Sequence, residues 1–398
     1  MLTRTLYILG AGFSKTFGLP LTNEFLAMLV EDGTNEMFFS KIDNACRNFY
    51  PSFRTSLQNY PNVEDFYNYY CSLINYYDLL NVPANKYVLD FIQEFNFEVS
   101  GFLENKTKNI KPDEEAYIYE FCNMLDYGDA VITFNWDNVL ETYLEKSKKK
   151  YKFTFDITPS KNEIPVLKLH GSIDWFSVGN LPPDKSLYQL ILQYNDGGRT
   201  NFLIRVLDKE FANLLRREGN IAFFIPPTLY KDEMFKPIDK LWANAYFLLR
   251  NSLNKFFIGY SLSKEDTMAR VLFSSYHFFA NAEEDNRLDD KEQIIVINSG
   301  EGMDLHYRKY CWEEISFLCA TFKRFIDVRN KKIDLQREFR PYMEELLKYE
   351  SDKFIQQIAE MVFSSGLNIA INQFEENRLR EFVRENFDKN TEVQDNEK

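Results

Sequence analysis

Six short apolar runs recur along the chain, and each ends in a polar or glycine-bearing sequence. The runs cover residues 5–9, 130–133, 166–169, 221–225, 255–258 and 293–297. Continuous apolar runs of this length are typical of strands that are buried on both faces of a parallel sheet. Ligands of such sheets bind outside the carboxyl ends of the strands. We therefore expect the polar sequences that follow these runs to build one site.

Between the first two runs the apolar spacing becomes that of helices. From about residue 24 to 126 apolar positions recur three and four residues apart, for example at Tyr87, Val88, Phe91 and Phe95. No strand pattern interrupts this stretch. The sequence therefore predicts a helical insertion after the first strand of the sheet.

The later runs alternate with helical patterns, and this alternation indicates the fold class. Helices are predicted at 139–146, 211–217, 238–253 and 266–280, and residues 178–220 are interpreted as a loop with some helix. After residue 302 only helical spacing is visible, followed by a polar tail from residue 389. We predict an α/β fold, with a Rossmann-like parallel sheet of six strands and helices on both faces. One domain would cover 1–305, and a helical C-terminal region would cover 306–398.

The composition of the chain argues against several classes of function. The 398 residues carry a net charge of −13, so the isolated chain has no overall electrostatic reason to bind nucleic acid. The five cysteines include no Cys-x-x-Cys pair, which argues against a zinc ribbon and fits reduced thiols. No apolar stretch is long enough for a bilayer, and no secretory signal is evident. We expect a soluble cytoplasmic protein without a metal or a membrane partner.

The first run leads into Gly10-Ala11-Gly12-Phe13-Ser14, a candidate phosphate-binding turn. Glycines let the backbone approach a pyrophosphate, and a following helix offers amide donors. Lys15 stands where the dinucleotide fingerprint has its third glycine, and no Gly-Lys-Ser/Thr follows. The pattern therefore supports neither an ordinary dehydrogenase nor a P-loop ATPase. Taken alone, a tight turn without a ligand is an equally good interpretation.

Two further strand ends carry polar groups of catalytic type. Asn135 and Asp137 directly follow the second run, and His170 follows the third, beside Gly171 and Ser172. An asparagine at a strand end is often only a turn former, and a lone histidine is usually structural. Their shared position at one sheet edge favours a functional interpretation.

An amide and one histidine beside a dinucleotide turn suit cleavage of the bond between nicotinamide and ribose. The leaving group is a cationic pyridinium that departs neutral, so no strong acid is needed, whereas ordinary glycosidases use two carboxylates. Asn135 could orient water and the ribose hydroxyls, and His170 could accept a proton. The sequence offers no metal-ligand cluster and no Ser-His-Asp or cysteine arrangement for another chemistry.

Taken together, the motifs resemble the sirtuin-like family, and more closely its bacterial antiphage-defence branch. The motifs, spread over roughly residues 1–300, are Gly10-Ala11-Gly12-Phe13-Ser14 with Gly18-Leu19-Pro20, Thr133-Phe134-Asn135-Trp136-Asp137, Leu169-His170-Gly171-Ser172-Ile173-Asp174-Trp175, Gly259-Tyr260-Ser261-Leu262 with Asp266, and Ile297-Asn298. The resemblance implies a Rossmann-type domain that binds NAD as its substrate, with Asn135 and His170 as the catalytic pair.

The resemblance also implies a set of NAD-binding residues. They are Gly10, Ala11, Gly12, Phe13, Ser14, Asp137, Ser172, Gly259, Ser261 and Asn298. Asp137 would lie near the nicotinamide, Ser261 near the phosphates and Asn298 near the adenosine ribose. The roles of Asp174 and Tyr260 stay open, and for Asp266 we favour a cap of the following helix.

The chain departs from deacylating sirtuins in two ways. It lacks their four zinc cysteines, and it has a helical insertion where their small substrate-binding domain is organised. These departures favour NAD hydrolysis, to ADP-ribose and nicotinamide, over protein deacylation; cyclisation of NAD stays open.

The resemblance implies an NAD-depleting effector of abortive infection. We expect it to be gated by homo-oligomerisation or by a HerA-type hexameric ATPase partner, with a phage component as the trigger. The alternatives are a non-catalytic sensor of NAD or an ADP-ribose derivative, and a nucleic-acid-processing subunit of an ATPase complex.

Overall fold

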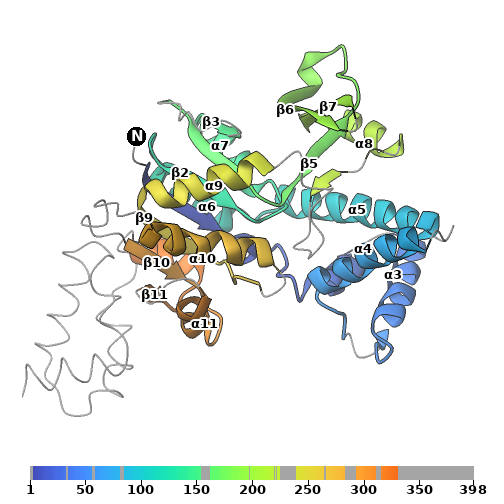
Figure 1. Ribbon diagram of the computed structural model, residues 1–398, viewed down its shortest axis with the longest axis horizontal. Coiled ribbons are helices and arrows are strands. Elements are labelled where there is room, and N and C mark those ends of the chain that lie inside the picture. Colours follow the sequence, from blue (N-terminus) through green and yellow to red (C-terminus); the bar gives the residue numbers. More distant parts are fainter. Residues whose placement is uncertain are drawn as a thin grey trace, which may run out of the picture.

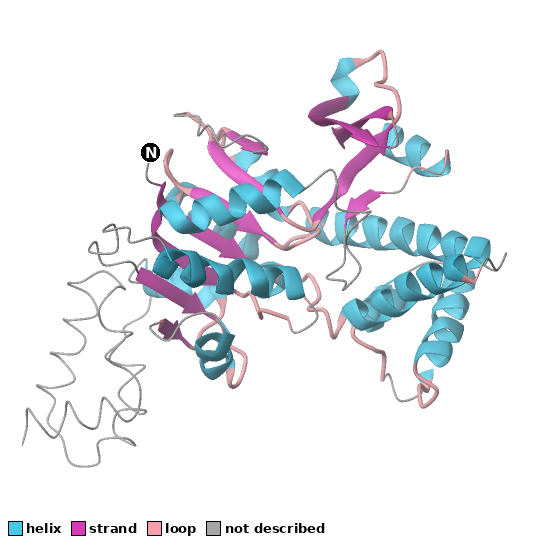
Figure 2. Cartoon of the chain, viewed as in Figure 1, coloured by secondary structure: helices cyan, strands magenta, loops and turns pink. Residues whose placement is uncertain are grey.

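The computed structural model describes residues 3–32, 35–55, 59–80, 85–153, 162–196, 198–218, 220, 222–224, 239–263, 266–282, 293–310 and 315–329. Figure 1 shows a main sheet with helices before and behind it, a group of long helices to one side, and a smaller sheet above that group. Figure 2 shows the same view by secondary structure.

The main sheet is parallel and has seven strands. Their order across the sheet is β11 (Ser316–Leu318), β10 (Gln293–Ile297), β9 (Ser252–Ile258), β1 (Thr3–Leu9), β2 (Ala130–Thr133), β4 (Ile164–Lys168) and β3 (Tyr151–Phe153). In register, Leu9 lies between Thr133 and Ile258, and Thr133 pairs with Lys168. The strands therefore end level with one another, and the sequences that follow them meet at one edge.

Helices cover both faces of this sheet, as predicted. Phe256 and Phe257 are neighbours on β9, so their side chains point to opposite faces. The Phe257 ring lies 5.1 Å from Phe273 on α10 (Thr267–Ala282), and the Phe256 ring lies 6.3 Å from Phe325 on α12 (Phe322–Arg329). The parallel Rossmann-like α/β fold is confirmed, with a core between the two layers of helices.

The number of strands and the place of one of them differ from the prediction. The sheet has seven strands and not six, because the three-residue strands β3 and β11 were not predicted and β11 follows residue 302. The predicted strand at 221–225 corresponds to β8 (Ala222–Phe224), which belongs to a second, antiparallel sheet. An apolar run shows that a strand is buried, but it does not show which sheet buries it.

The second sheet has the order β6 (Tyr188–Asp196), β7 (Arg199–Val206), β5 (Gly171–Val178), β8. The expected loop at 178–220 is therefore wrong: it contains the β6–β7 hairpin, a 3₁₀ turn at Lys185–Leu187 and α8 (Lys209–Arg217). The outer half of β7 is exposed, so its sequence lacks a long apolar run. The Gly197-Gly198 pair between the two strands of the hairpin is a common hairpin signal.

The helical insertion is present. It comprises α2 (Phe25–Asp32), α3 (Glu36–Phe49), α4 (Val63–Leu79), α5 (Asn85–Lys108) and α6 (Pro112–Met124). Helices α3, α4 and α5 stand beside the sheet in Figure 1. Helix α6 returns to the sheet, where the Phe121 ring lies 5.4 Å from Tyr7 of β1. The insertion therefore borders the sheet edge at which the strands end.

The remaining helices connect the strands. They are α1 (Ala11–Lys15), α7 (Val139–Lys146), α9 (Asp239–Asn251) and α11 (Met303–Tyr310). The predicted helix at 139–146 is confirmed, and α8, α9 and α10 lie within two residues of their predicted bounds. Most of the predicted helical C-terminal region, with its polar tail, lies outside the described residues. Among the helices that are described, none is long and apolar enough to cross a membrane.

Candidate functional site

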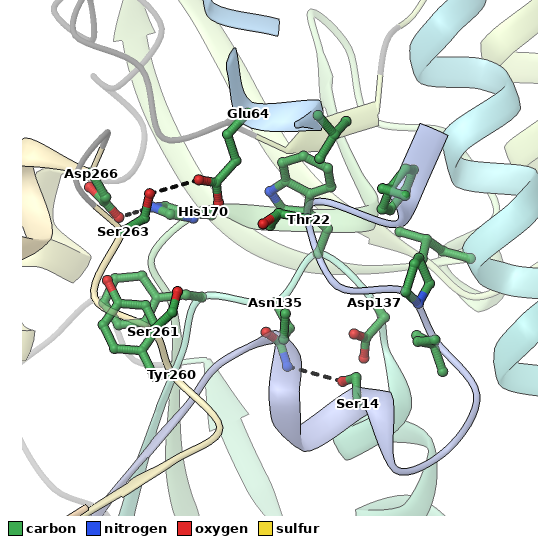
Figure 3. A pocket seen from close by; sticks show the side chains of 18 residues that line it. Ser14, Thr22, Glu64, Asn135, Asp137, His170, Tyr260, Ser261, Ser263 and Asp266 are labelled. Carbon is green, nitrogen blue, oxygen red and sulfur yellow. Dashed lines mark hydrogen bonds and ion pairs between the residues drawn. The ribbon is translucent and has the colours of Figure 1, made fainter. Parts of the chain in front are cut away.

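A cavity of about 90 Å³ opens at the carboxyl edge of the parallel sheet. Its lining comes from the β1 turn, the ends of β2 and β4, the loop after β9 and the insertion. The lining residues are Ala11, Ser14, Leu19, Pro20, Thr22, Phe25, Val63, Glu64, Leu103, Phe134, Asn135, Trp136, Asp137, His170, Tyr260, Ser261, Ser263 and Asp266. The structure therefore brings the predicted pair, Asn135 and His170, to one cavity (Figure 3).

One side of the cavity, here named the amide wall, consists of Asn135, Ser14 and Asp137. Asn135 is 9% exposed, and its Nδ2 donates to the backbone oxygen of Gly10 and to Ser14 Oγ, each at 3.0 Å. The Ser14 hydroxyl also bonds the Asp137 side chain. Because both Nδ2 protons have protein acceptors, the atom that Asn135 offers to a ligand is Oδ1, an acceptor.

Buried charges lie beneath the amide wall. Lys168, at the end of β4, donates to the backbone oxygen of Asp137 and lies 2.9 Å from Glu141 of α7, and both side chains are 1% exposed. Burial raises the pKa of Asp137, and the nearby Lys168 charge and the Ser14 hydroxyl only partly offset this. Through its hydrogen bond to the backbone oxygen of Asp137, Lys168 thus helps to hold the turn after β2 in place.

The opposite side, here named the imidazole wall, consists of His170, Asp266, Ser263 and Glu64. His170 Nε2 lies 2.8 Å from Asp266 Oδ2, and these side chains are 5% and 1% exposed. Asp266 Oδ1 accepts from Ala269 N at 3.1 Å, so the predicted cap of α10 is confirmed. The same carboxylate therefore caps a helix and contacts the imidazole.

The helical insertion completes the imidazole wall. Ser263 Oγ, in the loop after β9, donates to Glu64 Oε2 of α4 at 2.7 Å, across 199 positions of sequence. Sequence reasoning missed Glu64, because an acid in the first turn of a helix is an ordinary feature. It also missed Ser263, although this residue stands two positions after the predicted Ser261.

The glycine turn has a packing role that its sequence did not reveal. Gly10 N donates to Ile258 O at 3.1 Å, and Gly12 N donates to Gly259 O at 2.8 Å. A Cβ on Gly12 would lie 2.7 Å from Gly259 Cα, so the glycines let the turn and the loop after β9 pack backbone to backbone. Helix α1 has only five residues. Binding of a pyrophosphate by this turn stays a prediction.

Of the other predicted NAD-binding residues, some line the cavity and others do not. Ala11, Ser14, Asp137 and Ser261 line the cavity, whereas Phe13 packs in the core with its ring 4.7 Å from that of Phe322.

Ser172 and Asn298 support the loops around the cavity. Ser172 Oγ donates to Trp136 O at 3.4 Å, and Asn298 Nδ2 donates to Tyr260 O at 2.9 Å. Their roles toward NAD stay predictions.

Asp174, whose role was open, does not line the cavity. Its Oδ2 accepts from Arg205 Nε at 2.8 Å. Burial alone would raise the pKa of Asp174, but the Arg205 and Lys168 charges outweigh burial and lower it. In the part of the chain that the structure describes, no group of three or more His, Cys, Asp or Glu side chains is placed to hold a metal ion.

Comparisons with known proteins place these residues in a family context. No curated protein matches the chain. Among solved structures, Sir2Tm bound to a propionylated peptide has 13% identity and a TM-score of 0.34, with 83% of this chain and 93% of that chain covered. A Sir2 homologue in complex with NAD has 14% identity and a TM-score of 0.34, with 82% and 88% covered. Residues 129–317, which supply Asn135, His170 and Asp266, match the family model of the SIR2-like domain.

Proposed function

We propose that this chain is an NAD+ glycohydrolase that releases nicotinamide and ADP-ribose. One observation carries the proposal: an amide acceptor on Asn135 and a carboxylate-paired imidazole on His170 line the same cavity at the carboxyl edge of the sheet. The match of residues 129–317 to the SIR2-like domain supports this chemistry, because both residues lie inside the matched segment.

The proposed reaction needs little from the protein beyond positioning. The bond between ribose C1′ and the nicotinamide nitrogen breaks, and its electron pair neutralises the pyridinium. A water oxygen bonds to C1′, and the water proton passes to His170. Asn135 Oδ1 accepts a hydrogen bond from that water or from a ribose hydroxyl. The high burial of both side chains strengthens these polar contacts, because the local dielectric constant is low.

The experiment is nicotinamide release from NAD, followed by chromatography, for the purified chain and for Asn135→Ala and His170→Ala. We expect each variant to lose about 10²- to 10⁴-fold in rate while still unfolding in one cooperative thermal transition, which shows that it is folded. Asn109→Ala, in the exposed turn directly after α5, is the matched control and should keep full activity. Binding of NAD without release in any assembly would instead support the sensor hypothesis.

We further propose that the activity depletes NAD as an antiphage effector and is gated by assembly of this chain or by a HerA-type ATPase partner. The motif resemblance supports this role. Nicotinamide release should then rise when a HerA-type hexameric ATPase is added to the isolated chain. Full activity of an isolated monomer would contradict the gating, and metal-dependent DNA cleavage by the assembly would favour the nucleic-acid alternative.

A further inference from the structure

The carboxylate of Asp266 serves two partners at once. Oδ1 accepts from the backbone nitrogen of Ala269 at 3.1 Å, and Oδ2 lies 2.8 Å from His170 Nε2 (Figure 3). Both side chains of this pair are more than nine-tenths buried. At this distance the two atoms interact electrostatically, although their geometry is not that of a directed hydrogen bond.

Asp266 is itself held by the first turn of α10. Its backbone nitrogen donates to Ser263 O at 3.2 Å, and its carbonyl accepts from Arg270 N at 3.1 Å. The ring centroids of Phe134 and Trp242 lie 5.2 Å and 6.2 Å from the imidazole centroid. The imidazole therefore packs near two aromatic rings and faces a carboxylate that is itself held in place.

The contact decides which ring nitrogen can take a proton. An unprotonated Nε2 would hold its lone pair 2.8 Å from an ionised carboxylate oxygen, which would be repulsive. Neutral His170 is therefore the Nε2–H tautomer. Nδ1 is then the unprotonated ring nitrogen, and it is the one that can accept a proton. When that proton arrives, the buried carboxylate stabilises the resulting imidazolium.

We propose that Asp266 is a positioning residue: it holds His170 in the Nε2–H tautomer and makes Nδ1 the proton acceptor. The inference rests on the proposed NAD hydrolysis for its kinetic consequence but not for the tautomer. Among the described residues, the other titratable side chains that line the cavity are Glu64 of α4, Asp137 after β2 and Tyr260 after β9.

The first test is ¹⁵N NMR of the full chain with labelled histidine. The chain has three histidines, so single substitutions at His277 and His306 assign the His170 signals. We expect the Nε2–H tautomer in the parent chain and its loss in Asp266→Asn. An Nδ1–H tautomer in the parent chain would overturn the proposal, whether or not NAD is hydrolysed.

The second test compares Asp266→Asn with Asp266→Ser. Asparagine and serine are both good helix caps, so we expect both variants to unfold close to the parent temperature. We expect kcat to fall at least about tenfold, within the range of a proton-transfer contribution, with KM for NAD changed less than about threefold. In Asp266→Asn the acid limb of the kcat profile should move to lower pH, because the imidazolium loses its anionic partner.

A folded Asp266→Asn variant with the parent kcat and pH profile would overturn the positioning role while leaving NAD hydrolysis intact. Conversely, the Nε2–H tautomer in a chain that releases no nicotinamide would support Asp266 as a positioning residue and contradict NAD hydrolysis. A failure of the positioning role can therefore be told apart from a failure of the proposed function.

Discussion

The amide wall and the imidazole wall enclose the same cavity but are built differently. Asn135, on the amide wall, is held by a backbone oxygen and a hydroxyl of the turn that follows the neighbouring strand. The imidazole wall depends on side-chain contacts between distant segments, His170 with Asp266 and Ser263 with Glu64. Substitutions that add atoms where the backbone packs closely should therefore destabilise the amide wall. Substitutions that remove a polar side chain should instead destabilise the imidazole wall.

The sharpest test of the amide wall is Gly259→Ala. Gly259 has φ +61°, and a Cβ there would lie 2.3 Å from Phe13 N and 2.6 Å from Gly12 Cα. Backbone atoms cannot move aside as a flexible side chain can. We expect a loss of about 4–6 kcal/mol in the free energy of unfolding, the upper range of strain and overpacking combined, measured by urea denaturation.

Gly18→Ala is the matched control for that experiment. Gly18 also has a positive φ, +81°, but nothing lies within 4 Å of the added Cβ. Only the left-handed backbone then costs free energy, about 1–2 kcal/mol. Equal losses in the two variants would show that the backbone contact between the turn and the loop does not matter.

Lys168 should give the next largest effect, because it lies beneath the amide wall and is two positions before His170. Lys168→Met removes the buried partner of Glu141 and the donor to Asp137 O. Breaking such a pair costs about 3–5 kcal/mol. The double variant Lys168→Met with Glu141→Leu should recover much of that loss, because it also removes the unpaired acid.

The loss in Lys168→Met should also depend on pH. Burial raises the pKa of Glu141, and Lys168 opposes this rise, so the variant raises that pKa further. At low pH the acid is protonated in both the folded and unfolded states and adds no penalty. Relative to the parent chain, the penalty appears as the pH rises above the already raised folded pKa of Glu141 and grows toward the still higher pKa in the variant. Unfolding free energies at pH 5 and pH 8 check this, and a loss independent of pH would contradict it.

The sequence predicted the amide wall better than the imidazole wall, for a physical reason. Asn135 and His170 could be found because a parallel sheet brings the ends of consecutive buried strands together, and the apolar runs mark those ends. The cap by Asp266 is a local signal and was predicted. Its contact with His170 was not, because it depends on how α10 lies over the sheet.

The limits on predicting the fold have a similar origin. The β8 run is as apolar as the others, yet β8 pairs antiparallel with β5. Pairing direction depends on the partner strand and not on the run itself. Glu64 likewise reaches the cavity only through the packing of the insertion, since its own helix gives it no distinctive spacing.

The smallest expected effect concerns the hydrogen bond between Ser263 and Glu64, which joins the loop after β9 to the insertion. A double-mutant cycle of Ser263→Ala and Glu64→Ala should give a coupling of about 0.5–1.5 kcal/mol in the free energy of unfolding, the usual net value of one hydrogen bond. Ser40→Ala is the control hydroxyl, because Ser40 Oγ donates to Glu36 O within its own exposed helix turn. It should show no coupling to Glu64.

A coupling near zero for Ser263 and Glu64 would mean that the insertion and the loop are held together by apolar packing alone. The imidazole wall would then consist of only His170 and Asp266, and the contrast with the amide wall would rest on that single contact. A coupling in the expected range would instead make the insertion an energetic part of the site. The placement of α4 would then be coupled in free energy to the loop that leads to Asp266.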